Sequence, residues 1–274
     1  MNELGDKMNI TELFSNAFNY SIRDLGKLGI LTAFFIGFLI LYLISIASTT
    51  INPILGMVLI GVTIIFFLVM ILVYNGYMFS VIKDTVVNKS FSIQKETLPE
   101  FNFVEIIING LKLAILWFIY RLIPLIVGII FIVITILSFG LASTQDLVSG
   151  PTPAFSAVLI FAIILWIVFQ ILYTFFTLLA YTATGRLAET SDFGSIFEFK
   201  EIFATASRIG WGNFVIWFII LLIIGMVIIV LAMLPLLYFP YFSVLGIIAL
   251  IFIPAFLIVF ESRAVGLIYN ESKQ

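Results

Sequence analysis

Six long apolar stretches constrain how this chain can fold. They cover residues 30–48, 54–78, 114–142, 156–180, 213–234 and 242–260. A helix needs about 20 predominantly apolar residues to cross a hydrocarbon layer about 30 Å thick, and each stretch is close to that length. The runs are continuous rather than alternating, so they favour helices over a transmembrane β-barrel. The sequence therefore predicts an all-α integral membrane protein with about six transmembrane helices.

The composition agrees with a chain that is solvated by lipid. Hydrophobic residues make up 63% and charged residues 10% of the sequence, whereas soluble domains have about 45–50% and about 25%. We expect the lipid bilayer to be the main partner. The net charge of −2 argues against nucleic acid, because phosphate binding needs a surplus of Lys and Arg. Protein partners and the oligomeric state do not follow from the sequence.

Histidine and cysteine are both absent from the chain. Their absence removes the commonest general base, the usual zinc ligands and the reactive thiolate. No metalloprotease motif, P-loop or nucleophile–base pair occurs in the sequence. The acidic side chains near Glu100 and Glu198 are explained by helix starts and polar helix faces rather than by a metal site. We therefore expect no enzymatic activity, no cofactor and no bound metal.

The basic residues predict how the chain is oriented. Connections 48–53, 142–155 and 235–241 contain no Lys or Arg. Nearly all Lys and Arg lie before span 30–48, between spans 54–78 and 114–142, between spans 156–180 and 213–234, or after span 242–260. Segments rich in Lys and Arg stay on the cytoplasmic side of a membrane. We expect a multi-pass protein of the cell membrane whose N-terminus, C-terminus and two long loops are cytoplasmic.

An amphipathic stretch precedes each odd-numbered span, which suggests a threefold repeat. Each stretch begins with a capping-box pattern, in which a polar residue is followed three positions later by Glu. The three boxes are Asn9 with Glu12, Thr97 with Glu100, and Ser195 with Glu198. Each stretch then reaches a glycine that would permit a turn into the span, and these glycines are Gly26, Gly110 and Gly210.

The chain then reads as a single transmembrane domain, 1–274, with possible repeat units 9–83, 97–188 and 195–269. Each unit would contain a cytoplasmic amphipathic helix followed by a hairpin of two transmembrane helices. Repeats of this kind build many transporter folds. The alternative is that the three stretches share only the local physics of helices at a membrane surface.

Three polar side chains inside the apolar stretches are candidate site residues. Arg121 is the one ionisable candidate, and a charge within the membrane is by default a functional hypothesis. Its side chain could instead extend to the headgroups, because it lies only nine residues after Lys112. Asn75 and Gln170 could line a pathway or form hydrogen bonds between helices.

Short motifs near the predicted helix ends resemble an archaeal multi-pass membrane family that is catalogued as domain of unknown function 4013. The motifs are Asn-Gly-Tyr at 75–77, Leu-Pro-Glu-Phe at 98–101, Asn-Gly-Leu-Lys at 109–112, Ala-Tyr-Thr-Ala-Thr-Gly-Arg-Leu at 180–187, Arg-Ile-Gly-Trp-Gly-Asn-Phe at 208–214 and Glu-Ser-Arg-Ala-Val-Gly-Leu-Ile-Tyr at 261–269. The likeness runs from about Phe14 to Tyr269. It implies a protein of the archaeal cell membrane, and it brings no catalytic residues.

Two functions fit these features. The apparent repeat, the prolines within spans and Arg121 favour a transporter or a channel-like component, although the spans contain few polar residues. The other function is a non-transporting membrane scaffold or assembly partner, which docks proteins through its cytoplasmic amphipathic helices.

The predicted topology is testable with single cysteines because the chain has none of its own. Cysteine at position 49, 149 or 239 should react with a membrane-impermeant maleimide added outside cells, and cysteine at position 90 should react only after the cells are opened. Labelling of position 90 in intact cells would contradict the orientation.

Overall fold

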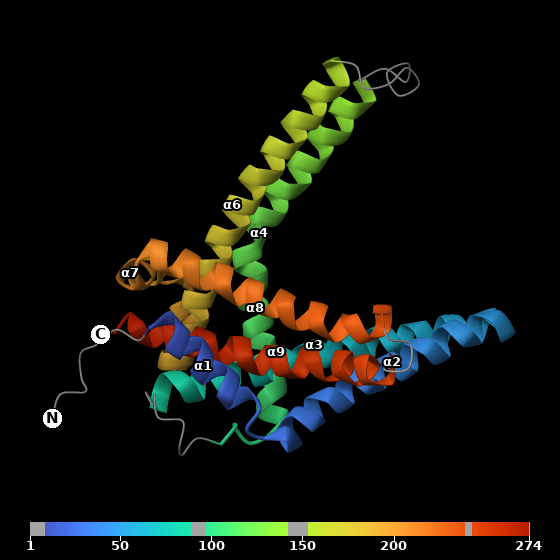
Figure 1. Ribbon diagram of the computed structural model, residues 1–274, viewed down its shortest axis with the longest axis horizontal. Helices are drawn as coiled ribbons and strands as arrows, with labels where there is room; N and C mark the ends of the chain where they lie inside the picture. Colours follow the sequence, from blue (N-terminus) through green and yellow to red (C-terminus); the bar gives the residue numbers. More distant parts are fainter. Residues whose placement is uncertain (1–8, 89–96, 142–152, 239–242, 274) are drawn as a thin grey trace. The chain divides into compact units, whose positions relative to one another are not determined.

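A computed structural model of the chain describes residues 9–88, 97–141, 153–238 and 243–273. Every regular element in these ranges is helical, which confirms the all-α prediction (Figure 1). The α-helices are α1 (Ile10–Ser21), α2 (Leu25–Ile51), α3 (Pro53–Asn88), α4 (Phe103–Leu141), α6 (Pro153–Thr190), α7 (Phe199–Ile209), α8 (Trp211–Tyr238) and α9 (Ser243–Glu271). A 3-10 helix, η1 (Phe193–Phe197), precedes α7.

Six of the described helices are long and apolar enough to cross a membrane, as predicted. They are α2, α3, α4, α6, α8 and α9. The helices continue past the apolar stretches: α3 has 36 residues, or about 54 Å at 1.5 Å per residue. Apolar character therefore predicts where a helix is solvated by lipid, and not where it ends. Positions 142 and 242, at the edges of two predicted spans, lie outside the described residues.

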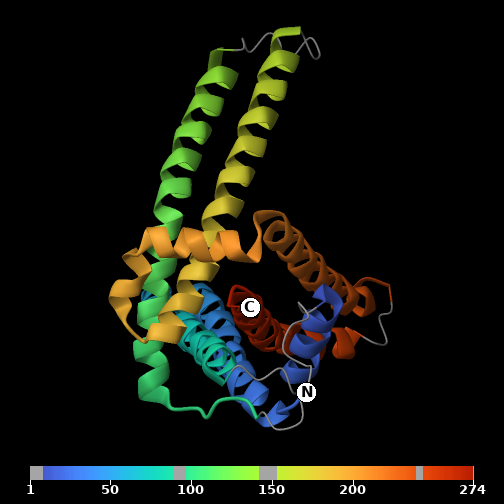
Figure 2. The ribbon, with the colours of Figure 1, turned by 90° about the vertical axis from the view of Figure 1, so that its left-hand side faces the viewer.

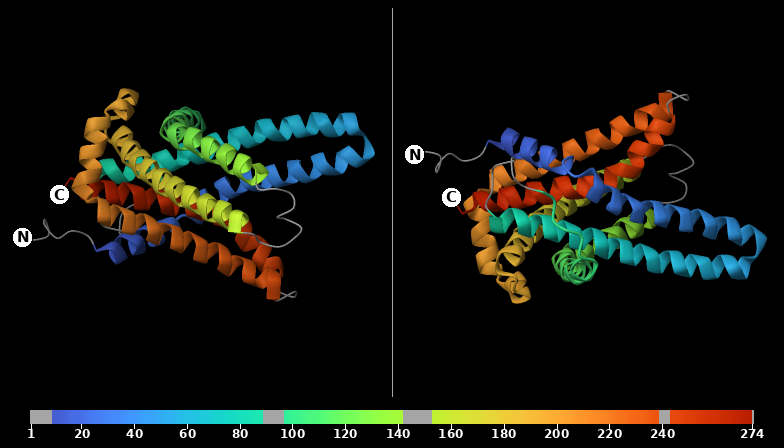
Figure 3. Two further views of the ribbon diagram at one scale, coloured as in Figure 1. Left: turned by 90° about the horizontal axis from the view of Figure 1, so that it is seen from above. Right: turned by 90° about the horizontal axis from the view of Figure 1, so that it is seen from below.

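The chain divides into two compact units. One consists of the segments up to Ala114 and from Thr182 onward, and the other is Ile115–Tyr181. In the smaller unit, the parts of α4 and α6 that belong to it run side by side (Figures 1 and 2). In the larger unit, α2 packs against α3 and α8 packs against α9 (Figure 3).

Helix α9 is the centre of the larger unit, because it packs against α1, α2, α3, α7 and α8. Figure 2 looks along α9 and shows α1, α3 and α8 around it. From Phe260 to Asn270 nearly every side chain of α9 is buried, whatever face of the helix it occupies. Burial on all sides marks a core helix. The dense core of this unit thus lies at the polar end of the spans, while their apolar middles expose large side chains that lipid can solvate.

Two glycines bring the backbones of α3 and α4 close together. A Cβ atom at Gly76 of α3 would collide with the backbone of Ile106, and one at Gly110 of α4 would collide with the backbone of Leu72. Small residues let two membrane helices approach until their backbones touch. The turn predicted at Gly110 is therefore wrong: α4 continues through it, so no separate amphipathic helix precedes this span.

The predicted helix starts are only partly right. Asn9 caps α1 by accepting a hydrogen bond from the backbone of Thr11. The box at Thr97 is wrong, because α4 begins at Phe103 and the side chain of Asn102 accepts from the backbone of Glu105. The box at Ser195 is also wrong, since Ser195 lies inside η1.

The predicted turns at the other two glycines have different outcomes. Gly26 lies in the first turn of α2, so the bend between α1 and α2 comes before it. Gly210 does separate α7 from α8, with a φ of +88° that L side chains rarely adopt.

Replacement of Gly76 by Ala should lower the free energy of unfolding by about 1–3 kcal/mol, because the added methyl group overpacks a backbone contact. Gly61→Ala on the same helix is the matched control, since nothing lies within 4 Å of its added Cβ. Unfolding of the purified variants in detergent measures both. Equal stability of the two variants would contradict the contact between α3 and α4.

Candidate functional site: a buried arginine in α9

Arg263 is completely buried, although it follows the last of the predicted spans, 242–260. Its exposed fraction is 0%, and it lies well inside α9, which continues to Glu271. Gly266, three positions later on the helix, brings α9 against α3, because an added Cβ would meet the side chain of Thr85. This close approach puts Thr85 within reach of the guanidinium group.

Two helices supply hydrogen-bond acceptors to Arg263. The Nε–H donates to Oδ1 of Asn16 on α1 at 3.1 Å, and the Nη1–H donates to Oγ1 of Thr85 on α3 at 3.1 Å. Asn16 and Thr85 are themselves buried. Thr85 uses its own hydroxyl hydrogen on the carbonyl of Val81, at 2.8 Å, which leaves its oxygen as the acceptor. Hydrogen bonds to a charged group are about twice as strong as those between neutral groups.

An aromatic ring and a carboxylate extend the network. The guanidinium carbon of Arg263 lies 4.5 Å from the ring centroid of Tyr20 on α1, a distance at which cation–π attraction operates. The hydroxyl of Tyr20 donates to Oδ2 of Asp84 at 3.5 Å. Further along α9, Nδ2 of Asn270 donates to the backbone carbonyl of Thr85 at 3.0 Å. We call Arg263, Asn16, Tyr20, Thr85, Asp84 and Asn270 the arginine cluster, and it joins α1, α3 and α9.

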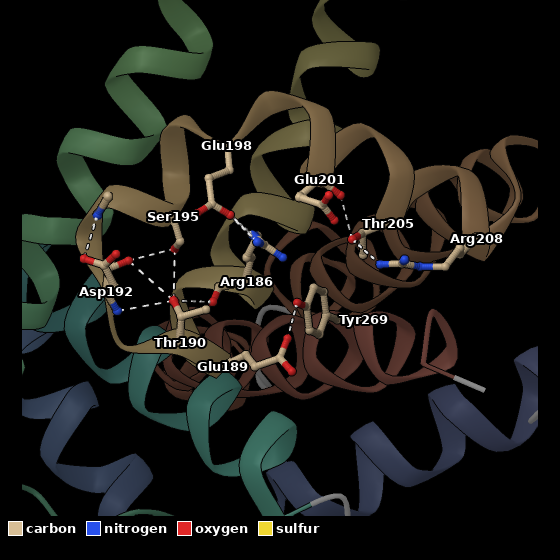
Figure 4. Close-up of polar contacts among 11 residues, drawn as sticks. Arg186, Glu189, Thr190, Asp192, Ser195, Glu198, Glu201, Thr205, Arg208 and Tyr269 are labelled. Atoms are coloured by element: carbon tan, nitrogen blue, oxygen red, sulfur yellow. Dashed lines mark hydrogen bonds and ion pairs between the residues drawn. The ribbon is translucent and has the colours of Figure 1, made fainter.

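A second set of polar contacts joins the ends of α6, η1 and α9 (Figure 4). The Nε–H of Arg186 donates to Oε2 of Glu198 at 2.8 Å, so the Glu198 carboxylate binds α6 instead of completing a capping box. The hydroxyl of Tyr269 donates to Oε2 of Glu189 at 2.7 Å. Lys273 lies 3.0 Å from the other carboxylate oxygen of Glu189. These contacts attach the segment that carries α7 to the same core helix.

The arrangement is suited to holding helices together. Arg263 does not line either of two hollows that the described residues form. One is a polar cleft of about 400 Å³ beside Lys83, Asp84, Glu100 and Glu105, and the other is an apolar groove of about 350 Å³ between α4 and α6. The described residues contain no group of three Asp or Glu side chains that could hold a metal ion.

The three predicted site residues lie on three different helices. Arg121 is exposed on α4, with its guanidinium carbon 4.5 Å from the ring centroid of Trp117 and 6.0 Å from that of Tyr173. Gln170 is exposed on α6, and Asn75 is half-buried on α3. Arg121 and Gln170 belong to the smaller unit and Asn75 to the larger one.

One signal in the sequence could have revealed Arg263. It is flanked by small residues, Ser262, Ala264 and Gly266, and small residues at this spacing are typical of closely packed membrane helices. A charge within such a pattern is more consistent with burial than with a loop.

Comparison with known proteins identifies a family without a known activity. Residues 59–237 match the model of a family described as protein of unknown function (DUF4013). The matched range includes the Gly76–Gly110 contact and ends before α9. No curated protein and no solved structure matches the chain.

Replacement of Arg263 by Met should lower the free energy of unfolding by at least about 2 kcal/mol, because each buried polar group left without its partner costs about 1–3 kcal/mol. Arg121→Met makes the same chemical change at an exposed side chain, and it should cost less than about 0.5 kcal/mol. Unfolding in detergent compares the two, and equal losses would refute a structural role for the arginine cluster.

Proposed function

The chain belongs to the DUF4013 family, whose function is unknown, and we propose that it is a non-transporting scaffold of the membrane. The family and the six long apolar helices indicate a polytopic membrane protein. Within this proposal the spans form three hairpins in the cell membrane of an archaeon. The distribution of Lys and Arg supports cytoplasmic termini and a cytoplasmic location for the arginine cluster.

The burial of Arg263 is the observation that carries the proposal. A side chain that binds or moves a solute must face a space that the solute can enter. Arg263 has no exposed surface, and its Nε–H and Nη1–H donate to Asn16 and Thr85. This fully buried charge, the most deeply buried one among the described residues of the larger unit, therefore serves cohesion between helices.

Polar side chains within the spans of the larger unit support the same conclusion. The hydroxyl oxygens of Ser45 on α2 and Thr63 on α3 lie 2.7 Å apart and are buried. Each hydroxyl has one hydrogen, so one of the two donates to the other, and the second donates to a backbone carbonyl of its own helix, Leu41 for Ser45 or Leu59 for Thr63. Such pairs satisfy polar groups in hydrocarbon and add cohesion between helices. Because Ser45 and Thr63 are buried, their hydroxyls do not face a space that a solute could enter.

The short helices α1 and α7 leave their polar sides available to a protein partner. The apolar face of α1, with Leu13, Phe14 and Ala17, is already buried, and so is that of α7, with Ile202, Ala206 and Ile209. A protein partner would therefore bind the polar surfaces, which carry Glu12 and Asn19 on α1 and Lys200, Glu201 and Arg208 on α7. Without histidine or cysteine, a catalytic role forms no part of this proposal.

A transport component is the second candidate, and Arg121 is the observation that favours it. A guanidinium group on an apolar helix, beside Trp117 and Tyr173, could attract an anionic solute. Aromatic neighbours equally stabilise an arginine whose charged end extends to the headgroups.

Two variants separate the candidates. A single cysteine on the polar surface of α7 is used to cross-link each variant to its partner in native membranes. A scaffold should still capture the partner after Arg121→Leu and should lose it after Arg263→Met. Reconstituted vesicles of the wild type and both variants should show equal, background permeability to inorganic anions. An anion flux of the wild type that Arg121→Leu abolishes would replace the scaffold with a transporter.

A further inference from the structure

Helix α7 has an apolar surface beyond the face that it buries in the protein. Phe199 is 57% and Phe203 is 47% exposed. At 100° per residue these two rings share one flank of the helix, between the buried face and the polar side. The polar side carries Lys200, Glu201 and Arg208, all of which are exposed. An exposed aromatic flank that adjoins a charged side is typical of a helix that lies in the plane of a membrane surface.

The aromatic flank of α7 continues into a span. The ring of Phe203 lies 5.0 Å from that of Trp211, which is the first residue of α8. Nε1–H of Trp211 donates to Oγ of Ser207, at 3.2 Å, which holds the indole against α7. The positive φ of Gly210 makes the sharp turn between the two helices. The exposed rings are thus contiguous with the surface where α8 enters lipid.

Helix α1 repeats this arrangement at its C-terminal end. Phe18 is 45% exposed, and Ile22, the residue that caps the helix, is 47% exposed, whereas Leu13 and Ala17 on the neighbouring face are buried. The ring of Phe18 packs edge-on against that of Phe256 at 5.5 Å. Phe256 belongs to the apolar part of α9. The exposed edge of α1 therefore also joins the surface of a span.

We propose that the exposed edges of α1 (Phe18, Ile22) and α7 (Phe199, Phe203) lie in the interfacial layer of the bilayer, at the boundary between headgroups and acyl chains. Aromatic side chains concentrate in that layer, and burial of an apolar edge there is favourable. Both helices are packed on α9, which carries Arg263. With their edges in the interfacial layer, they would hold the arginine cluster just outside the hydrocarbon. A lipid surface fits these edges better than a protein does, since each edge is continuous with a lipid-facing span.

Single cysteines in the otherwise cysteine-free chain test this proposal. The full-length variants Phe18→Cys and Phe203→Cys are compared with Asn19→Cys and Glu201→Cys, which are exposed neighbours on the polar sides of the same helices. Each variant is placed in phosphatidylcholine nanodiscs, where both membrane faces are reachable. Two readouts are taken: the rate of reaction with a charged maleimide, and the quenching of an attached fluorophore by spin-labelled lipids. Thermal unfolding of each variant, compared with that of the parent, verifies folding.

Positions 18 and 203 should react about tenfold more slowly than positions 19 and 201, since a tenfold ratio corresponds to 1.4 kcal/mol of burial. Their fluorophores should be quenched by a spin label near the headgroup. Equal reaction rates at all four positions would overturn the proposal and leave the edges open to water. Slow reaction without quenching by lipid would also overturn it, because the edges would then be covered by protein. Neither readout depends on the scaffold role, so the two proposals can fail separately.

Discussion

The buried guanidinium of Arg263 is the constraint on which the larger unit depends. An isolated ion costs several kcal/mol to remove from water, so it is tolerated only where its donors are satisfied. Its acceptors come from α1 and α3, and α9 therefore cannot be buried in this way until both helices are in place. Gly266 and Asn270 fix α9 against Thr85 on the same side. The hydrogen bonds of Arg263 thus form only when α1, α3 and α9 are packed correctly.

The dense core lies where it does because the middles of the spans are solvated by lipid and their polar ends by water. Between helices in lipid the hydrophobic effect is absent, because acyl chains are as apolar as Leu, and association depends on close contact and hydrogen bonds. The Gly76–Gly110 contact and the Ser45–Thr63 pair are of these two kinds. At the polar ends water adds its own driving force, and there the side chains of α9 are buried on all sides. Polar residues in this protein serve cohesion, which is the basis of the scaffold proposal.

The sequence predicts the spans well because solvation by lipid depends on local composition. It does not predict Arg263, whose acceptors lie 247 and 178 residues away along the chain. Gly110 shows the ambiguity of local patterns, since a glycine can permit a turn or a close helix contact, and the presence of Leu72 decides between them. Glu198 could have capped a helix, but Arg186 is the partner that its carboxylate binds. Arg121 and Gln170 remain predictions without an assigned role.

A double-mutant cycle between Arg263 and Asn16 tests the central claim most directly. The free energies of unfolding of the wild type, Arg263→Met, Asn16→Ala and the double variant are measured in the same detergent. A hydrogen bond to a charged group predicts a coupling energy of about 1.5–3 kcal/mol. A coupling energy near zero would show that Arg263 does not hold α1 on α9, and it would contradict this account.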